Sequence, residues 1–486
     1  TSAGYQDKLA VRATGAAALT LTNPADIAAG ATSAVGVVAA SAGSLAGNLT
    51  LGFTSKALAG TTLADAALAG GSVALTGAAY DYAQPTIAST LSLGNRRVGT
   101  SASLLVTNTT RTAAAYQDSL DAVASTTVGT LSLANPANIL AGKSGNVTVT
   151  AATAGSLAGD VTFALTSNAN GVTGLDATTA LTGQTVAVTG AAYDLANPSY
   201  ATTLALGNRR VGPAEVIAIA NPARANGAAA YQDSLDFVAA SSNAKLTLAG
   251  ATANVAAGSS ADLGVSVNTA GSLAATLSLG LASNANGVSG LTGQSLAAGS
   301  ITVTGAAYDT ARATLAATTL ALGDVRPGAS LGTALTNTVV TAAAYQDSLD
   351  IVASGAPATF TLAAPSKLFA GQSGDVVVTA TKAGSLAANI SLALTSNANG
   401  LTGLANSALA GQTVAVTGAV YDLANPSYAA TQALGNLRVG VTARTVDVTN
   451  ATITSAGYQD KLAVRATGAA ALTLTNPADI AAGATS

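Results

Sequence analysis

The sequence contains no cysteine, histidine, methionine or tryptophan. Without cysteine and histidine it cannot form the usual zinc, copper, haem or iron–sulfur sites, nor a catalytic triad that needs either residue. Only one of its 22 acidic residues is a glutamate, Glu215, so a catalytic pair of carboxylates would have to come from aspartates. We therefore expect this chain not to be an enzyme.

Charged and aromatic residues are also scarce. Charged residues make up 8% of the chain, whereas an ordinary soluble domain has about 25%, and the net charge is −3. Such a chain offers no basic stripe for nucleic acid, and aromatics at 3% are too few to stack on bases. Thr, Ser, Asn and Gly interrupt every apolar run well before the roughly 20 residues of a spanning helix, so we expect no membrane span in this chain.

Aspartate could still bind calcium, which takes six to eight oxygen ligands. The sequence has no D-x-D-x-D-G loop, and its nearest pattern is D-S-L-D at 118–121, 233–236 and 347–350. Side chains alternate along a strand, so these two aspartates are poorly placed for one ion. We expect no cofactor, and calcium is the one metal ion left open.

Four short strings recur along the chain in a fixed order. AGSLA begins at 42, 154, 270 and 383. AYQD or GYQD places a tyrosine at 5, 116, 231, 345 and 458, and TG-A-(A/V)-YD places one at 80, 193, 308 and 421. LG-(N/D)-x-R-x-G begins at Leu93, Leu206, Leu322 and Leu434. The chain is therefore four copies of a unit of about 113 residues plus a remainder, and that length suits one globular domain.

The unit has the pattern of short strands. In TVAVTGAAY (185–193), Val186 and Val188 fall on one face while threonine and alanine fall on the other, and 130–134, 146–151, 203–207 and 215–220 alternate in the same way. Asn-Gly at 170–171, 286–287 and 399–400 indicates hairpin turns, and the recurring Asn-Pro pairs mark strand ends. About seven short strands per unit predict an all-β chain of tandem Ig-like β-sandwich domains.

The order of these motifs resembles a known family. A strand L-x-L-G-N-x-R-V-G is followed by a strand ending in T-N or A-N (106–110, 219–223, 448–452), then by L-A-G or A-A-G-x-S, and finally by V-x-V-T-G. This order is similar to the bacterial choice-of-anchor D repeats, which are Ig-like domains of the Hydin-related type. Where that family often has Phe before the glycine, this chain has leucine. The resemblance implies an extracellular, multi-domain bacterial surface protein.

Domain boundaries follow from the YDLANPSY segment, where Pro198 cannot continue a strand. We expect Ig-like domains at 83–195, 196–309 and 310–423, with partial domains at 1–82 (lacking its first strands) and 424–486 (holding only first strands). Residues 454–486 repeat residues 1–33 without a single change. Such a duplication predicts a periodic array, either one covalent chain or subunits joined by donor strands.

The tyrosines hold most of the aromatic content. Stacking on carbohydrate is one interpretation, with the neighbouring aspartate binding sugar hydroxyls. The alternative, which we favour, is a structural tyrosine at a strand end, with its ring in the core and its hydroxyl bonded to backbone as in a tyrosine corner. The positions are Tyr80, Tyr193, Tyr308 and Tyr421 in the first motif, and Tyr116, Tyr231 and Tyr345 in the second.

One arginine recurs in every LG-(N/D)-x-R-x-G motif, at Arg97, Arg210, Arg326 and Arg438, beside a residue that varies. Period-2 geometry puts the arginine and its neighbour on opposite faces. A fixed arginine indicates a defined partner, and we expect an aspartate of YD or YQD bound through two prongs at a domain junction. Recognition of an acidic glycan is the alternative.

These features predict a structural extracellular protein that is the repeat unit of a bacterial surface filament, sheath or matrix fibre. A nearly uncharged surface offers little repulsion between chains, so we expect self-association into a periodic array. The alternative is the stalk of a giant repetitive adhesin whose binding tip lies elsewhere. In both cases the chain is extracellular or on the cell surface.

Overall fold

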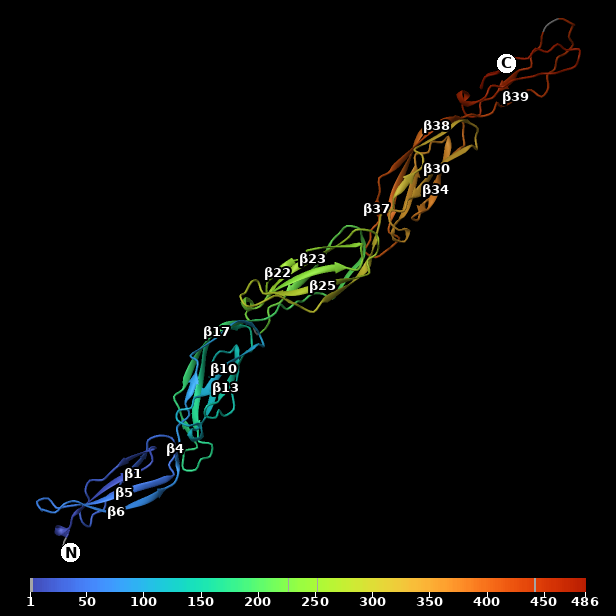
Figure 1. Cartoon of the computed structure of the whole chain (residues 1–486). Helices are drawn as coiled ribbons and strands as arrows, with labels where there is room; N and C mark the ends of the chain where they lie inside the picture. The colour runs from blue at the N-terminus through green and yellow to red at the C-terminus, as the bar shows by residue number, and fades with distance from the viewer. Residues whose placement is uncertain (1–2, 226, 251, 441–442) are drawn as a thin grey trace.

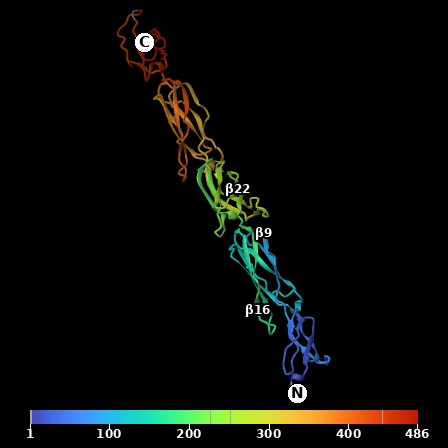
Figure 2. The same ribbon diagram turned by 90° about the vertical axis from the view of Figure 1, so that its left-hand side faces the viewer.

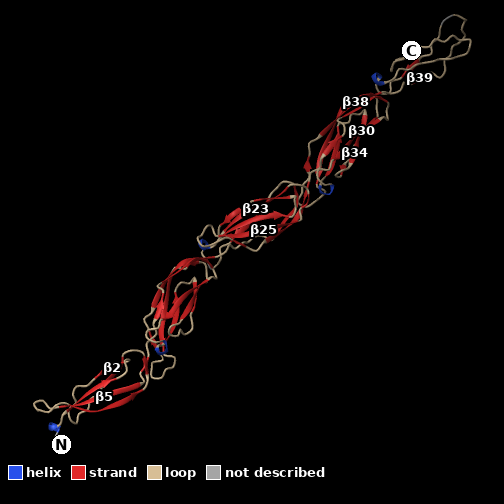
Figure 3. Ribbon diagram, viewed as in Figure 1, coloured by secondary structure: helices blue, strands red, loops and turns tan. Residues whose placement is uncertain are grey.

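The computed structural model describes residues 3–225, 227–250, 252–440 and 443–486. The chain is a slender rod of five β-rich units that follow one another from the N-terminus to the C-terminus, and a view turned by 90° shows the same line (Figures 1 and 2). Apart from five three-residue 3-10 helices, its described regular structure is β-strand (Figure 3). The predicted all-β chain of tandem sandwiches is confirmed. No described helix is long and apolar enough to cross a membrane.

Residues 83–195 form a complete two-layer sandwich. One sheet has the order β12-β13-β10-β8, and the other has the order β11-β15-β17, with β9, β14 and β16 at its margins. Its elements are β8 (Pro85–Ile87), β9 (Thr90–Arg97), β10 (Ser101–Asn108), η2 (Ala114–Tyr116), β11 (Ser119–Thr126), β12 (Leu131–Ala134), β13 (Ser144–Ala151), β14 (Gly155–Ser156), β15 (Gly159–Asn168), β16 (Thr178–Ala180) and β17 (Gln184–Tyr193).

Residues 196–309 repeat this plan, with β18-β27-β25-β20-β22 facing β19-β23-β21. Their elements are β18 (Thr203–Arg210), β19 (Glu215–Asn221), η3 (Ala229–Tyr231), β20 (Ser234–Ser241), β21 (Leu246–Ala249), β22 (Thr252–Val255), β23 (Ser259–Val267), β24 (Gly271–Ser272), β25 (Ala275–Asn284), β26 (Gln294–Ser295) and β27 (Gly299–Tyr308).

Residues 310–423 repeat it again, with β29-β38-β36-β31-β33 facing β28-β30-β34-β32. Their elements are β28 (Ala313–Leu315), β29 (Thr319–Val325), β30 (Ser330–Asn337), η4 (Ala343–Tyr345), β31 (Ser348–Ser354), β32 (Phe360–Ala363), β33 (Lys367–Leu368), β34 (Ser373–Ala380), β35 (Gly384–Ser385), β36 (Ala388–Asn397), β37 (Ser407–Ala408) and β38 (Gln412–Val420).

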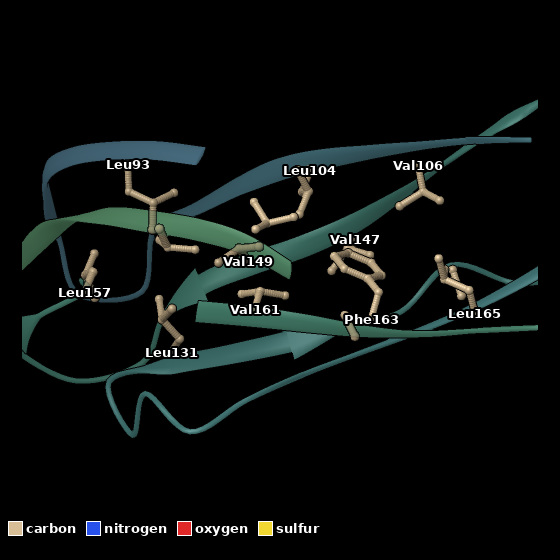
Figure 4. Close-up of a cluster of buried hydrophobic side chains, with 14 of the residues drawn as sticks. Leu93, Leu104, Val106, Leu131, Val147, Val149, Leu157, Val161, Phe163 and Leu165 are labelled. Carbon is tan, nitrogen blue, oxygen red and sulfur yellow. The ribbon is translucent and has the colours of Figure 1, made fainter. Parts of the chain in front are cut away.

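Small aliphatic side chains fill each sandwich. In the 83–195 unit, alternate residues of both sheets point inward and meet in one layer, where Val147, Val149 and Val161 are fully buried (Figure 4). Phe163 is the one aromatic residue among the buried members of this cluster. Equivalent clusters occupy the next two units, so each of these three complete sandwiches has its own core, as expected for beads on a string.

The strand that carries the recurring arginine lies parallel to the last strand of its own unit. β9 pairs with β17, β18 with β27, and β29 with β38, and each pairing shifts register at the paired glycines. A Cβ at Gly190 would lie only 2.5 Å from the carbonyl oxygen of Gly94, and one at Gly305 would lie 2.6 Å from that of Gly207. The glycines of the LG and TG motifs therefore allow two backbones to approach closely.

The two terminal units contain fewer strands. Residues 3–82 form a sheet β1-β5-β6 with the pairs β2-β3 and β4-β7, and the elements are η1 (Ala3–Tyr5), β1 (Lys8–Thr14), β2 (Leu19–Thr22), β3 (Gly36–Ala39), β4 (Gly43–Ser44), β5 (Gly47–Lys56), β6 (Ala66–Leu75) and β7 (Ala78–Ala79). The described residues of 424–486 contain β39 (Pro426–Tyr428), β40 (Val448–Asn450) and η5 (Ala456–Tyr458).

Candidate functional site at the domain junctions

All four boundaries between units have the same backbone clasp. At the first boundary the amide of Asp81 donates to the carbonyl of Tyr116 (2.9 Å), and the amide of Asp118 donates to the carbonyl of Asp81 (2.9 Å). The YD segment that ends one unit thus runs parallel to the YQD segment of the next. The same bonds recur at Asp194, Asp309 and Asp422.

Two tyrosine rings meet beside each clasp. Tyr80 and Tyr116 form an edge-on pair with ring centroids 5.8 Å apart. The other pairs are Tyr193–Tyr231 at 5.5 Å, Tyr308–Tyr345 at 5.6 Å and Tyr421–Tyr458 at 5.7 Å. These distances and tilts are favourable for aromatic rings. The structure thus brings the tyrosines of the two motifs together, one from each side of a boundary.

The expectation that these rings lie in the core is wrong. The paired tyrosines are half-buried, none of them belongs to a core cluster, and no described hydrogen bond involves their hydroxyls. They differ in this from the tyrosine corner of Ig-like domains. A ring at the end of its strand can lie beyond the core of its own unit, and here the next unit supplies the surface that covers it.

The recurring arginine reaches across the boundary to the aspartate of YQD. Arg210 binds Asp347 through two prongs, with Nη1 3.0 Å from Oδ1 and Nη2 2.8 Å from Oδ2. Arg97 lies 2.8 Å from Asp233, and Arg326 binds Asp460. The hydrogen bond that Arg326 donates to Asp460, together with the negative charge of that carboxylate, raises the pKa of the Arg326 guanidinium above its usual range. The side chains of Asp233 and Asp347 are 1% and 0% exposed.

The residue before the arginine turns back to its own unit, as the alternation of a strand requires. Arg96 donates twice to the carbonyl of Leu93, and Arg209 lies 3.2 Å from Glu215. The fixed arginine therefore contacts the next unit, whereas its variable neighbour does not.

Each YQD aspartate also has partners within its own unit. The hydroxyl of Ser396 donates to Asp347 Oδ2 (2.6 Å) and accepts from the amide of Ala311 (2.8 Å). Ser283 binds Asp233 in the same way, and Ser167 binds Asp118. A buried carboxylate needs such hydrogen bonds in addition to its counter-ion.

A buried amide network supports the clasp from below. Asn337, fully buried, donates to the carbonyls of Asp347 (2.9 Å) and Leu368 (3.1 Å) and accepts from Gln346 (3.0 Å). Asn108, Asn221 and Asn450 do the same with Gln117, Gln232 and Gln459. This network was not predicted from the sequence, although its asparagine and glutamine recur at fixed positions in the repeat and could have revealed it.

A second asparagine extends the junction to the hairpin of the next unit. Asn95 Nδ2 donates to the carbonyl of Ser289 (3.0 Å), and Asn208 Nδ2 donates to that of Thr402 (3.1 Å). Both acceptors follow an Asn-Gly turn in which Asn286 and Asn399 have positive φ, as predicted for such hairpins. The arginine contacts the same hairpins at Thr292 and Ala405.

The remaining predicted residue, Arg438, makes no hydrogen bond or ion pair with any described residue, and its side chain is exposed. Among the described residues, no group of three acidic side chains could hold a metal ion. The D-S-L-D aspartates diverge: Asp118 binds Ser167, while Asp121 accepts from Asn168.

No family model and no curated protein matches this chain. Solved structures with some likeness include titin domains I67–I69 (10% identity, 70% of this chain and 99% of that one, TM-score 0.29). Others are the human desmocollin-1 ectodomain (12%, 79% and 69%, TM-score 0.27) and the surface layer protein SbsC, domains 4–9 (13%, 86% and 58%, TM-score 0.18). At these identities and TM-scores, the likenesses carry no argument about function.

Proposed function

We propose that this chain is a structural extracellular protein, the repeat unit of a bacterial surface filament, sheath or matrix fibre, without catalytic activity. The observation that supports the proposal is the repeated junction. Backbone clasp and tyrosine pair recur at all four boundaries, and the arginine–aspartate pair recurs at three of them. A chain that served only to carry separate binding domains would need no such fixed connection, because flexible linkers are the default between domains.

The junction joins units by contacts that resist bending. Two main-chain bonds fix the approach of the two segments, the tyrosine rings fill the space beside them, and the arginine fork sets the orientation of the next unit. Contacts of this kind keep a long object straight. Stiffness along one axis is a property that a fibre requires.

Small-angle X-ray scattering of the full chain tests this mechanical role. We expect wild type to behave as an extended rod. The triple variant R97A/R210A/R326A should bend, which shortens the mean end-to-end distance and broadens its distribution. A matched triple, R111A/R312A/R465A, removes three exposed arginines whose side chains make no described bond and should scatter as wild type does. A wild-type chain as flexible as the first triple would contradict the proposal.

Location is tested on cells that produce the protein. Immunogold labelling with an antibody raised against residues 83–195 should decorate fibres or a sheath outside the cell. Labelling confined to the cell interior would overturn an extracellular role, whatever the stiffness of the rod.

A further inference from the structure

The N-terminal unit has two open sheet edges among the described residues, because β3, which carries Val37, pairs only with β2, and β6, which carries Val73, pairs only with β5. In the complete sandwich of residues 83–195, Val149 and Val186 are 0% and 1% exposed. The residues at the same repeat positions in the N-terminal unit, Val37 and Val73, are 43% and 45% exposed. Among the described residues, no strand lies parallel beside β6 in the way that β9 lies beside β17. An uncovered edge of this kind is a template for a further strand.

The glycine that would receive this strand is unobstructed. Gly77 occupies the repeat position of Gly190 and Gly305 and also has a positive φ, yet a Cβ at Gly77 would meet no atom within 4 Å. At Gly190 and Gly305, the backbone glycine of the parallel strand fills this space. The shape of the edge therefore matches an LG-(N/D)-x-R-x-G strand.

Asp118, the acid that corresponds to the arginine-binding aspartates at the other boundaries, has no arginine beside it among the described residues. Asp118 is 8% exposed and holds the position of Asp233 and Asp347. Its Oδ2 accepts from Ser167, but its buried Oδ1 has no hydrogen-bond partner in the described part of the chain. A buried carboxylate oxygen without a partner is costly, and its equivalents bind an arginine.

The hairpin of the 83–195 unit also lacks a contact among the described residues. At the two equivalent hairpins, an asparagine of the preceding unit makes this contact. Gly290 and Gly403 face the carbonyl oxygens of Asn95 and Asn208, whereas Gly174, at the same repeat position, has no neighbour within 4 Å of an added Cβ. The carbonyl of Thr173 corresponds to those of Ser289 and Thr402, which accept from the two asparagines.

One copy of the motif, at residues 434–440, makes none of these contacts with the residues that the structure describes. In residues 434–440, LGNLRVG, neither Asn436 nor Arg438 bonds to any described residue, and the described residues 429–440 contain no strand. Asn436 also matches the hairpin of the 83–195 unit, as the other copies of the motif show. Asn95 and Asn208 precede units with an S-N-A-N-G hairpin, while Asp324 precedes the unit that begins with β39. The 83–195 unit has S-N-A-N-G at 167–171, and 436 is asparagine.

From this complementarity we propose that the segment 434–440 of a second copy of this repeat unit binds parallel to β6 and places its Arg438 on Asp118 and its Asn436 on the carbonyl of Thr173. The inference rests on the proposed function and names the contacts that join one unit of the array to the next. The duplicated segment fits the same arrangement, because η5 and residues 459–486 show how residues 6–33 are held when β40 is beside them: Asn450 bonds to Gln459 and Ile480.

The test uses the full chain and a fluorescent synthetic peptide of residues 424–453, with the dissociation constant measured by anisotropy. We expect saturable binding of the peptide to the wild-type chain. Removing one partner of a charge pair at an interface should weaken binding by at least about 30-fold, so the R438D peptide should bind poorly to wild type, and the wild-type peptide should bind poorly to the D118R chain. Because both charges are exchanged, the R438D peptide should bind the D118R chain again.

Matched controls distinguish binding through the proposed contacts from non-specific binding of the peptide. The D447R peptide and the D160R chain change charge at exposed positions, since Asp447 corresponds to the exposed Leu105, and both should bind as wild type does. Gly77→Ala should abolish binding by filling the space for the glycine backbone, while Gly60→Ala, another open glycine with positive φ, should not. If circular dichroism shows that the D118R chain does not fold, the D118N chain is used instead, because its side-chain oxygen can still accept from Ser167.

No binding by the peptide, or binding that ignores Arg438 and Asp118, overturns the proposal. Calcium alone binding at Asp118 in calorimetry, and lost in D118N, would also overturn the arginine assignment. In each of these cases the scattering experiment on R97A/R210A/R326A stands, so failure of this inference is distinguishable from failure of the proposed function.

Discussion

Arg210→Ala is the substitution with the best-defined consequence in this structure. The guanidinium holds both oxygens of Asp347, which is 0% exposed, and Arg210 itself is 26% exposed. Breaking a buried pair by removing one partner costs about 3–5 kcal/mol. The hydroxyl of Ser396 stays on the carboxylate, and water can enter from the exposed side of the arginine, so we expect a loss at the lower end, about 3 kcal/mol.

The loss should appear in the 310–423 unit, which contains Asp347, rather than in the unit that contains the substitution. For a domain of this size, about 3 kcal/mol lowers the melting temperature by on the order of 10 °C. Differential scanning calorimetry of the full chain should show one transition moving down while the others stay in place. Hydrogen exchange would assign that transition to residues 310–423.

Arg209→Ala is the internal control. Its partner Glu215 is 52% exposed, so no buried charge is left behind, and a pair of this kind contributes at most about 1 kcal/mol. Any effect should fall on the 196–309 unit. Equal losses from the two substitutions, or an R210A loss within the 196–309 unit, would refute the assignment of the arginine to the junction.

Three further outcomes are expected. Dithiothreitol and EDTA should leave the melting temperature unchanged, because the sequence has no cysteine and the described residues hold no group of metal ligands; a fall of several degrees with EDTA in a thermal-shift assay would reinstate calcium. Gly305→Ala should destabilise its unit by several kcal/mol in chemical denaturation, since its Cβ would lie 2.6 Å from the carbonyl of Gly207; an unchanged midpoint would contradict this contact. Asn208→Asp should cost about 1–2 kcal/mol at the junction with the 310–423 unit in calorimetry, because it removes the donor to Thr402 and leaves that carbonyl facing a carboxylate, whereas Asp324→Asn should change little.

The sandwich could be predicted from the sequence because its signals are local. Alternating residues at 185–193 became β17, and the Asn-Gly turn at 170–171 has positive φ at both residues. The parallel pairing of β9 with β17 is not local, since Thr90 and Ala187 are paired across most of the unit. No pattern within either strand specifies that partner.

The junction could be predicted only in part from the sequence. Recurrence of the motif singled out Arg210 and limited its partner to the aspartates of YD and YQD. Only the fold decides between them, because Ser396 lies beside Asp347 on a strand about 50 residues further along the chain. The prediction that the ring of Tyr193 lies in the core was wrong for a similar reason. A half-buried ring at a strand end has the same local pattern whether its own unit or the next one covers it.

The residue at the asparagine position of LG-(N/D)-x-R-x-G adds an argument about order within the array. Asn95 and Asn208 each donate to the hairpin of the following unit, and both following units contain S-N-A-N-G. Asp324 cannot donate, and residues 55–62, which hold the hairpin position in the N-terminal unit, read SKALAGTT instead. The duplicated segment indicates that the unit after Asp324 is continued by residues like 34–82. In that case aspartate replaces asparagine at the one boundary where the following unit lacks the S-N-A-N-G hairpin that accepts the hydrogen bond. Neighbouring units would then be matched to one another, and a shuffled order of the same units should form weaker junctions even though every sandwich still folds.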